Sequence, residues 1–383
     1  MKILVISNYY PPYYIGGYEV ACFDTVQYLK DCGHEVYVLT GNYKNESIEF
    51  EEIYRKLKYI NYENPSYFDK HKVEVYNYEL TQELIKKITP DLVYFWSLRL
   101  ISLSPALAVQ KLQIKKVFEI GDLWMKGYFQ NTIFAKLKRS IKNYLPFFVG
   151  SFVEFSPSIC VSKWIEKEMK NKYLAKKTYV IPNGVKIYQK QKSNLSKKIR
   201  YMFCGRIDYS KGLDLALKAL SNLKDRGFFN FELHIYGEGH EGYINKCKKI
   251  IKVLNLDKEV KFCGKKEDIN KYYKNYDVLL MPTRMREPFG LVIIEAMAAG
   301  VVVIATNAYG PAEIITHNKD GLLFKNEDVN DLTKKILKIH SNTVLYENLR
   351  NAAFLKVFEK FNLLSVKKEV ENVLVRTAQK DIL

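Results

Sequence analysis

Short hydrophobic segments alternate with amphipathic segments along most of this chain. Near the N-terminus, the β-branched run from Lys2 to Ser7 predicts a buried strand, and a second such run extends from Glu35 to Thr40. Between them, apolar residues at helical spacing predict a helix from Tyr18 to Lys30. A strand, a loop, a helix and a second strand in this order are typical of a parallel α/β sheet.

The same alternation continues to about residue 180. Strands are predicted in DLVYFWS, IKKVFEIGDLW and SPSICVS, with a helix from about Thr81 before the first of them. Ser162 ends the last strand and is a suitable N-cap for the helix KWIEKEMKNKY. We therefore predict one doubly wound domain in the first half.

A second alternation follows a break at residues 180 to 198, where Pro182, Asn183, Gly184 and several lysines lack apolar periodicity. Its predicted strands are IRYMFCG, FELHIYG, VKFCG, DVLLMP, VVVIAT and GLLF, separated by helices, and one last helix is predicted at about 345 to 377. We expect two Rossmann-like domains, 1–182 and 183–361, with a C-terminal helix at about 362–383 that packs back on the first. Ligands are expected at the carboxyl ends of the strands, in a central cleft.

Composition excludes several classes of protein. The 383 residues are 48% hydrophobic, which suits two globular cores and argues against disorder. The apolar runs are too short to span a bilayer, and the N-terminus turns polar too early for a signal peptide, so a cytoplasmic protein is expected. The six cysteines show no CxxC spacing and predict reduced core thiols rather than a metal site.

A basic charge balance points to a polyanionic partner. Lys and Arg outnumber Asp and Glu by 60 to 42, which gives +18. Residues 131–148 place Phe134, Leu137, Ile141 and Leu145 every few positions among lysines, so a helix there either binds an anionic membrane surface or packs on the core with a solvated lysine edge. Nucleic acid is not expected, because no binding motif accompanies the charge.

The segment EPFGLVIIEAMAAG carries the most informative chemistry. Gly290 lets a ligand approach the backbone, and the free N–H groups of Leu291 and Val292 at a helix start can bind a diphosphate. Glu287 and Glu295 would then accept hydrogen bonds from hydroxyls at opposite ends of the ligand. The alternative is that both are ordinary glutamates of a helix start.

A second segment, GRIDYSKG, supplies two cations from one strand-to-helix loop. Arg206 and Lys211 would neutralise phosphate oxygens there, although surface solvation explains them as well. A third pattern, Gly237, Gly239 and Gly242, fits the G-x-G-x-x-G motif of nicotinamide dehydrogenases, with Asp257 as a ribose-binding acid. The oxidoreductase alternative leaves the cations and glutamates of the other two segments without a use.

Taken together, these segments resemble the family 4 glycosyltransferases of the GT-B fold, and the resemblance covers most of the chain. It rests on Gly16-Gly17, IPNGV, GRIDYSKGLDLAL, FELHIYGEG, VKFCG, EPFGLVIIEAMAAGVVVIAT, and GPAEII followed by GLLF. It implies that Arg206 and Lys211 hold the donor diphosphate, that Glu287 approaches the donor sugar and that Glu295 binds the ribose. The remaining donor-binding candidates are Gly16, Gly17, Gly237, Gly264, Phe289, Gly290, Leu291 and Val292.

The resemblance also implies a retaining transfer without a metal or another cofactor. In agreement, no two aspartates stand two positions apart, so a metal-binding DxD motif is absent from the sequence. Many relatives carry His-Asp where this chain has Gly121-Asp122. Glu119 or Asp122 could bind the acceptor or act as a base, and Asp122 could equally cap a helix.

The predicted function is transfer of a sugar from a nucleotide-sugar donor to an acceptor hydroxyl. If residues 131–148 bind the inner face of the cell membrane, the acceptor is expected to be a lipid-linked saccharide in cell-surface polysaccharide assembly. A sugar-nucleotide epimerase of the same fold is the other alternative. UDP-, GDP- and ADP-sugars all stay open as donors.

Overall fold

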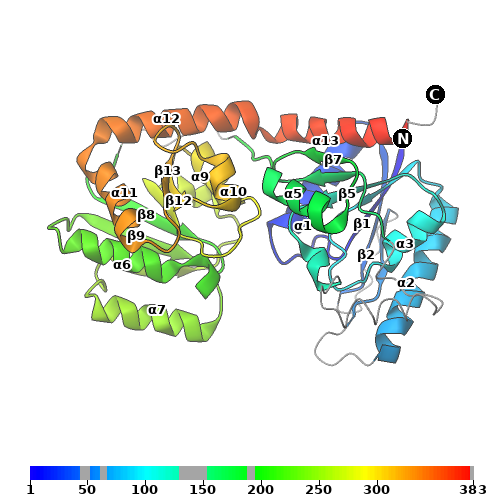
Figure 1. The fold of residues 1–383 in the computed structure, drawn as a ribbon, viewed down its shortest axis with the longest axis horizontal. Coiled ribbons are helices and arrows are strands. Elements are labelled where there is room, and N and C mark those ends of the chain that lie inside the picture. The colour runs from blue at the N-terminus through cyan, green and yellow to red at the C-terminus, as the bar shows by residue number, and fades with distance from the viewer. Residues whose placement is uncertain (44–51, 61–66, 129–152, 188–194, 380–383) are drawn as a thin grey trace. The chain divides into compact units, whose positions relative to one another are not determined.

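The computed structural model describes residues 1–43, 52–60, 67–128, 153–187 and 195–379, and in it the chain forms two compact units (Figure 1). Unit 1 comprises Met1–Ile181 and Lys367–Leu383, and unit 2 comprises Pro182–Val366. The second boundary falls inside the last helix, so the first turn of that helix belongs to unit 2.

Unit 1 is built on a parallel sheet of seven strands in the order β3-β2-β1-β4-β5-β6-β7. The strands are β1 (Lys2–Ser7), β2 (Glu35–Gly41), β3 (Ile53–Leu57), β4 (Leu92–Phe95), β5 (Lys116–Ile120), β6 (Ser158–Cys160) and β7 (Thr178–Val180). The helices are α1 (Gly17–Asp31), α2 (Tyr67–Ile88), α3 (Ser104–Lys111), α5 (Lys163–Tyr173) and α13 (Leu363–Ala378), with a 3-10 turn η1 (Trp124–Gly127).

Unit 2 repeats this architecture with a parallel sheet in the order β10-β9-β8-β11-β12-β13. The strands are β8 (Ile199–Cys204), β9 (Phe231–Tyr236), β10 (Val260–Gly264), β11 (Val278–Met281), β12 (Val302–Thr306) and β13 (Leu322–Phe324). The helices are α6 (Leu213–Lys224), α7 (Glu241–Val253), α8 (Asn270–Tyr273), α9 (Leu291–Ala298), α10 (Tyr309–Ile314), α11 (Val329–Ser341) and α12 (Thr343–Lys360), with a 3-10 turn η2 (Tyr209–Lys211).

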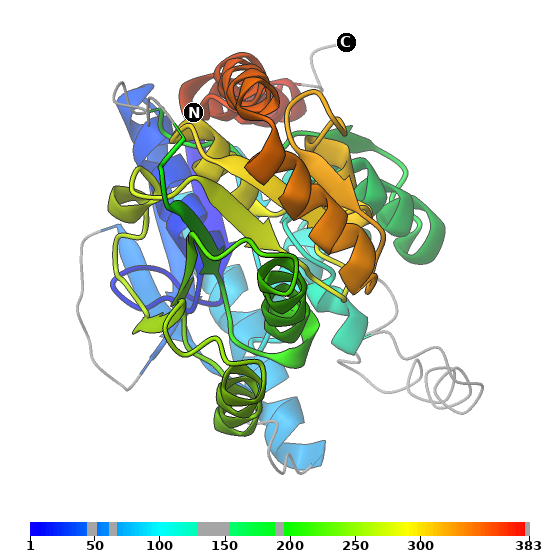
Figure 2. The same ribbon diagram turned by 90° about the vertical axis from the view of Figure 1, so that its left-hand side faces the viewer.

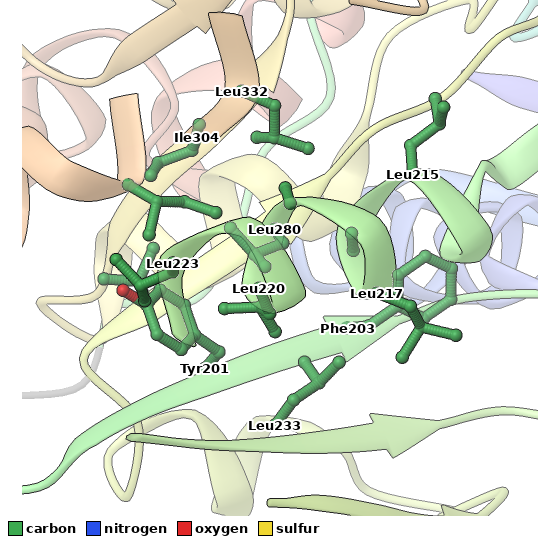
Figure 3. Close-up of a cluster of buried hydrophobic side chains, with 14 of the residues drawn as sticks. Tyr201, Phe203, Leu215, Leu217, Leu220, Leu223, Leu233, Leu280, Ile304 and Leu332 are labelled. Carbon is green, nitrogen blue, oxygen red and sulfur yellow. The ribbon is translucent and has the colours of Figure 1, made fainter. Parts of the chain in front are cut away.

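Alternating side chains of the unit 2 strands form cores on both faces of the sheet. Tyr201 and Phe203 of β8 point to the face where α6 packs beside α11, and Leu220 and Leu332 of these helices close that core (Figure 3). α9 covers the other face, where it contacts α12. In Figure 2, α6 and α7 are seen nearly end-on. Because both faces are covered, β11, β12 and β13 are buried at every position, as expected for strands of a parallel sheet. Charged residues occur only in β8, β9 and β10 of this sheet, at Arg200, Glu232 and Lys261.

The expected strands are present at the predicted segments, and the alternation predicts the fold class correctly. The helix 17–31 and the helix 163–173 also match, and Oγ of Ser162 caps the latter by accepting the N–H of Ile165 at 3.2 Å. β3 and α3 were not predicted, and α2 begins well before Thr81.

The prediction of one helix at 345–377 was wrong. Two helices, α12 and α13, occupy this range, and the helical conformation is interrupted at Phe361 and Asn362. Asn362 pairs there with Val185 in an isolated β-bridge. Oδ1 of Asn362 accepts the N–H of Leu364 at 3.0 Å and so caps the start of α13. A polar residue that offers the backbone an alternative partner favours such a break.

The strand order fixes where a ligand site is expected. In unit 2 the first strand, β8, lies between β9 and β11. The chain adds β9 and β10 on one side of β8, then crosses over to add β11 on the other side. Loops diverge at such a switch point and leave room for a ligand at the carboxyl ends of the strands. The loops that follow β8 and β11 are those that carry Lys211 and Glu287.

Candidate active site

An ion pair joins the two loops at the switch point of unit 2. Nζ of Lys211, in the loop after β8, lies 2.6 Å from Oε2 of Glu287, in the loop after β11. The side chains are 27% and 15% exposed, so the pair is shielded but still reachable from solvent. The sequence predicted both residues as site residues but did not predict that they pair.

A glycine allows these two loops to approach each other. Gly212 adopts a left-handed conformation with φ of +70°, and a Cβ atom there would lie 2.0 Å from the carbonyl oxygen of Pro282. A side chain at this position is therefore excluded both by backbone strain and by contact with the β11 loop. Gly212 also precedes α6, so the turn that carries Lys211 leads directly into that helix.

Arg206 lies at the same edge but is largely exposed, with 70% of its side chain accessible. Its Nε pairs with the carboxylate of Asp208, and Oδ1 of Asp208 accepts the N–H of Ser210 at 2.8 Å. Burial alone would raise the pKa of Asp208, but the hydrogen bonds from Ser210 and Arg206 outweigh it and hold the pKa below its usual value. Asp208 therefore stays charged and keeps the guanidinium at the loop.

The start of α9 follows Glu287 within the same loop. Gly290 precedes the helix with φ of +106°, which an L side chain rarely adopts, and Leu291 and Val292 form its half-buried first turn. Phe289 is only 4% exposed, and its ring packs against Phe361 with the centroids 6.0 Å apart. Phe289 therefore anchors the loop in unit 2 through its side chain.

Glu295 lies one turn further along α9 and is held by a tyrosine. The hydroxyl of Tyr273 in α8 donates to Oε2 of Glu295 over 2.9 Å. Burial raises the pKa of Glu295, and the hydrogen bond from Tyr273 partly offsets that rise. The sequence did not identify Tyr273, since the only indication was a tyrosine in a short helical segment.

The glycines of YGEGHEG have a packing role in this structure. A Cβ atom on Gly237 would lie 1.9 Å from the carbonyl oxygen of Gly205, and one on Gly239 would lie 2.0 Å from that of Ile207. Ile207 and Gly239 also form a parallel bridge between the loops after β8 and β9. Loop packing thus accounts for Gly237 and Gly239, two of the three glycines that resembled a dinucleotide motif. Gly264 ends β10 with φ of +68°, and the space where its Cβ would lie is open.

In unit 1, Gly16 and Gly17 lie exposed at the start of α1, where the N–H of Gly16 donates to Oε2 of Glu19 at 2.9 Å. Gly121 follows β5, and the space that a side chain there would need is filled by the ring of Tyr18, 2.2 Å from a Cβ at that position. The structure thus explains why a small residue stands here.

The acceptor-side candidates occupy different environments. Asp122 is half-exposed, and its Oδ2 pairs with Nη2 of Arg99 at 2.8 Å. Glu119 is 6% exposed, and its carboxyl group accepts the hydroxyl of Tyr94 at 2.5 Å. Burial raises the pKa of Glu119 to about 8, against a smaller lowering by Tyr94. A role of either residue at the acceptor stays a prediction.

Two further expectations concern membranes and metals. Residues 131–148, the predicted membrane-binding segment, lie outside the described residues. Among those that are described, no helix is long and apolar enough to span a bilayer, and no cluster of three or more His, Cys, Asp or Glu side chains is arranged to hold a metal ion.

A second ion pair behind the site was not predicted. Nη1 and Nη2 of Arg284 donate to Oδ1 and Oδ2 of Asp214 at 2.7 and 2.8 Å, and both side chains are less than a tenth exposed. Asp214 lies within the segment GRIDYSKGLDLAL, and Arg284 lies three residues before EPFGLVIIEAMAAG. Only the fold brings them together.

Two Rossmann-like units, the second with a polar switch point, define a two-domain α/β protein of the GT-B class. The chain matches the family model of glycosyltransferase family 4 over residues 15–188 and that of glycosyl transferases group 1 over residues 185–356. The protein therefore belongs to the group 1 glycosyltransferases and is similar to glycosyltransferase family 4.

Individual proteins agree with the family assignment. An uncharacterised glycosyltransferase of Methanocaldococcus jannaschii is 28% identical over 360 residues, which cover 91% of each chain. The poly(ribitol-phosphate) alpha-N-acetylglucosaminyltransferase of Staphylococcus aureus is 31% identical over 51% of this chain and 39% of its own. The crystal structure of Anabaena HepE in complex with UDP superposes with a TM-score of 0.75 at 19% identity, covering 98% of this chain and 100% of that one.

Proposed function

We propose that this glycosyltransferase moves a sugar from a nucleoside-diphosphate donor to a hydroxyl of a saccharide acceptor, with retention of configuration and without a metal ion. The observation that carries the proposal is the Lys211–Glu287 pair at the switch point of unit 2, beside the start of α9. A cation, an exposed guanidinium and helix N–H groups at one edge favour a diphosphate ligand. Anabaena HepE, a structural neighbour, binds UDP.

The catalytic role proposed for these groups follows from the charge that develops in glycosyl transfer. As the bond to the sugar breaks, the leaving diphosphate gathers negative charge. Lys211 and Arg206 would stabilise that charge in place of a divalent cation, and preorganised groups do so without reorganisation during the reaction. Glu287 holds the Lys211 ammonium in position within the edge of the sheet.

Glu295 is proposed to bind the ribose of the donor. One of its oxygens is occupied by Tyr273, which fixes the carboxyl group and leaves Oε1 to accept hydroxyl protons. A carboxylate with one fixed oxygen is a directional acceptor and loses little entropy on binding. The proposal keeps Phe289 in a supporting role, since its ring is buried inside unit 2.

Retention is proposed to proceed by attack of the acceptor on the face from which the diphosphate departs. Neither glutamate of the site is suited to act as a nucleophile, because Glu287 is paired with Lys211 and Glu295 is hydrogen-bonded to Tyr273. In the proposed step the acceptor oxygen forms a bond to the anomeric carbon, the bond to the phosphate oxygen breaks, and that oxygen takes the hydroxyl proton.

We further propose that the acceptor is a lipid-linked saccharide used in polysaccharide assembly. The support is the sequence of residues 131–148, where cations flank an apolar stripe that suits the surface of an anionic membrane. The relative from Staphylococcus aureus, by its name, acts on poly(ribitol-phosphate), which is also a polymeric acceptor. The protein would then work at the cytoplasmic face of the membrane.

The test of the proposed function is a donor screen followed by product analysis. Calorimetric titration with UDP, GDP and ADP should identify one nucleoside diphosphate that binds, and its sugar conjugates are then assayed with candidate acceptors. Release of the nucleoside diphosphate only when an acceptor is present supports transfer, whereas release without an acceptor would favour the epimerase. The anomeric coupling constant of the product by NMR reports retention or inversion.

A further inference from the structure

Arg284 is a buried arginine that contacts several residues around the loop after β8. It follows β11 by three residues, and its side chain is 7% exposed. Both terminal nitrogens bind the carboxylate of Asp214 in the first turn of α6, and Oδ1 of Asp214 also accepts the hydroxyl of Tyr243 at 2.6 Å. A looser contact joins Nε of Arg284 to Oε2 of Glu327 at 3.6 Å.

Arg284 also contacts the turn that carries Lys211. Nη1 donates to the carbonyl oxygen of Tyr209 at 3.0 Å, and the guanidinium carbon lies 4.2 Å from the centre of the Tyr209 ring. The backbone N–H of Arg284 donates to the carbonyl oxygen of Ser210 at 2.8 Å, and the hydroxyl of Thr283 donates to the same oxygen at 3.1 Å. The two residues before Lys211 are therefore fixed by the β11 loop.

That turn needs outside support. Residues 209–211 form a single 3-10 turn, a conformation with poor hydrogen-bond geometry and little intrinsic stability. Tyr209 is 56% exposed and so is held from one side only. The side chain of Arg284 supplies such support at Tyr209, and its backbone supplies it at Ser210.

Stability alone does not explain a buried pair of charges at this place. Removing a guanidinium and a carboxylate from water costs about as much as their attraction returns, so a buried ion pair is weak evidence of a contribution to stability. Burial would raise the pKa of Asp214, but the hydrogen bonds from Arg284 and Tyr243 hold it below the usual value. Asp214 stays charged, and the pair keeps its two parallel bonds.

We propose that Arg284 is a positioning residue of the diphosphate site. It holds the turn of Lys211 against the β11 loop, so that Lys211 and Glu287 keep their relative position, and it does not touch the substrate. This inference rests on the proposed function, because the arrangement of Lys211 and Glu287 matters only if they bind the donor diphosphate. Lysine does not reproduce these contacts, because its ammonium is a single nitrogen, whereas the planar guanidinium places two nitrogens parallel to the two oxygens of Asp214 and lies over the Tyr209 ring.

The test compares Arg284→Lys with a matched variant at the other end of α6. Lys224, the last residue of α6, pairs with Glu259 at 2.8 Å and with the carbonyl oxygen of Asn255 at 2.6 Å. Lys224→Met thus removes a mostly buried ion pair of the same unit, with side chains 23% and 12% exposed, away from the switch point. Both variants are titrated with the nucleoside diphosphate that the unaltered protein binds, and their Tm values are recorded.

We expect Arg284→Lys to weaken nucleoside-diphosphate binding by about 10-fold or more, the equivalent of one lost charge-assisted hydrogen bond. Its KM for the donor should rise while the KM for the acceptor is unchanged. Lys224→Met should lower Tm to a similar extent and leave the affinity as it was. Equal losses of affinity in the two variants, or none in Arg284→Lys, would overturn the inference.

A second variant keeps the test independent of folding. Tyr209→Leu removes the ring beneath the guanidinium at an exposed position, where unfolding is not expected. It should weaken binding in the same direction as Arg284→Lys. If the unaltered protein binds none of UDP, GDP and ADP, the proposed function itself fails and this inference with it; if it binds one of them and Arg284→Lys binds equally well, only the inference fails.

Discussion

The ammonium group of Lys211 and the carboxylate of Glu287 meet at 2.6 Å although 76 positions separate them in the sequence. Each residue ends a loop that leaves the carboxyl edge of the unit 2 sheet, one after β8 and one after β11. A cation held in this way is preorganised for an anion, and a carboxylate held in this way is no longer a free nucleophile. The pair therefore defines both the binding and the chemical expectations for the site.

Loss of either partner should abolish transfer while the fold persists. We expect Lys211→Ala and Glu287→Ala to lower kcat/KM at least about 100-fold, as for removal of one preorganised group that stabilises developing charge. Tm should change little, since a partly exposed pair contributes at most about 1 kcal/mol. The measurement is turnover beside circular dichroism melting, and near-normal turnover in both variants would refute the site assignment.

Chelation of metal ions should leave the enzyme active. The proposed mechanism assigns the charge of the leaving diphosphate to Lys211 and Arg206 rather than to a divalent cation. We expect the initial rate in excess EDTA to match the rate without it, and added Mg²⁺ or Mn²⁺ to give no large stimulation. A strict requirement for either ion would contradict the cation-based mechanism.

Donor binding should depend on the protonation of Glu295. Its carboxylate accepts ribose hydroxyls only when ionised, and burial raises its pKa, so affinity should fall with decreasing pH earlier than for an ordinary glutamate. Tyr273→Phe removes a hydrogen bond that lowers this pKa, so the midpoint of the fall should move to higher pH. The dissociation constant measured from roughly pH 4 to 8 gives both midpoints.

A matched control for this pH test is Tyr346→Phe. Tyr346 is a fully buried tyrosine of unit 2 whose hydroxyl makes no hydrogen bond in the described structure. Its removal should leave the midpoint where it is in the unaltered protein. An unchanged midpoint in Tyr273→Phe as well would show that Glu295 is not the titrating group.

The buried Glu119 should make stability fall as the pH rises. Its pKa is about 8 in the folded protein against an ordinary 4.5, so the folded state holds the proton more tightly. The resulting stabilisation is complete below pH 4.5 and is lost as the pH rises through 8. Glu119→Gln stays neutral, so its Tm should fall less across this window and exceed that of the unaltered protein at the upper end.

Asp122→Asn is the control for the prediction on Glu119, because it removes a carboxylate from the same segment at a half-exposed position. Its Tm should follow the pH dependence of the unaltered protein. If Glu119→Gln also follows it, the carboxyl group of Glu119 does not titrate in this range.

Membrane association should depend on two cations of the segment 131–148. We expect the protein to sediment with liposomes that contain anionic lipid, and Lys138→Glu with Arg139→Glu to reduce the bound fraction severalfold, since each basic residue near the surface adds about 1 kcal/mol. Raising the salt concentration should have the same effect. Equal sedimentation of both proteins would argue for a segment that packs on the core.

Much of the candidate site was within reach of the sequence. Arg206, Lys211, Glu287 and Glu295 stand in segments whose strand-loop-helix pattern is local, and parallel strands put their following loops on one edge. Tyr273 and Arg284 were missed, because a tyrosine in a four-residue helix and an arginine in a loop carry no pattern of their own. The break at Phe361 was missed for a related reason, since the bridge between Asn362 and Val185 is a contact between segments far apart in the sequence.

The sequence by itself determined the two parallel sheets, the loops in which the candidate site residues lie and the family to which the chain belongs, because hydrophobic periodicity and motif order are properties of neighbouring residues. Only the tertiary structure decided which polar side chains pair: Lys211 with Glu287, Arg284 with Asp214, and Glu119 with Tyr94 inside unit 1. Such partners depend on ångström-scale approaches such as that of Gly212 to Pro282. Those approaches are set by how whole elements pack, and no local pattern encodes them.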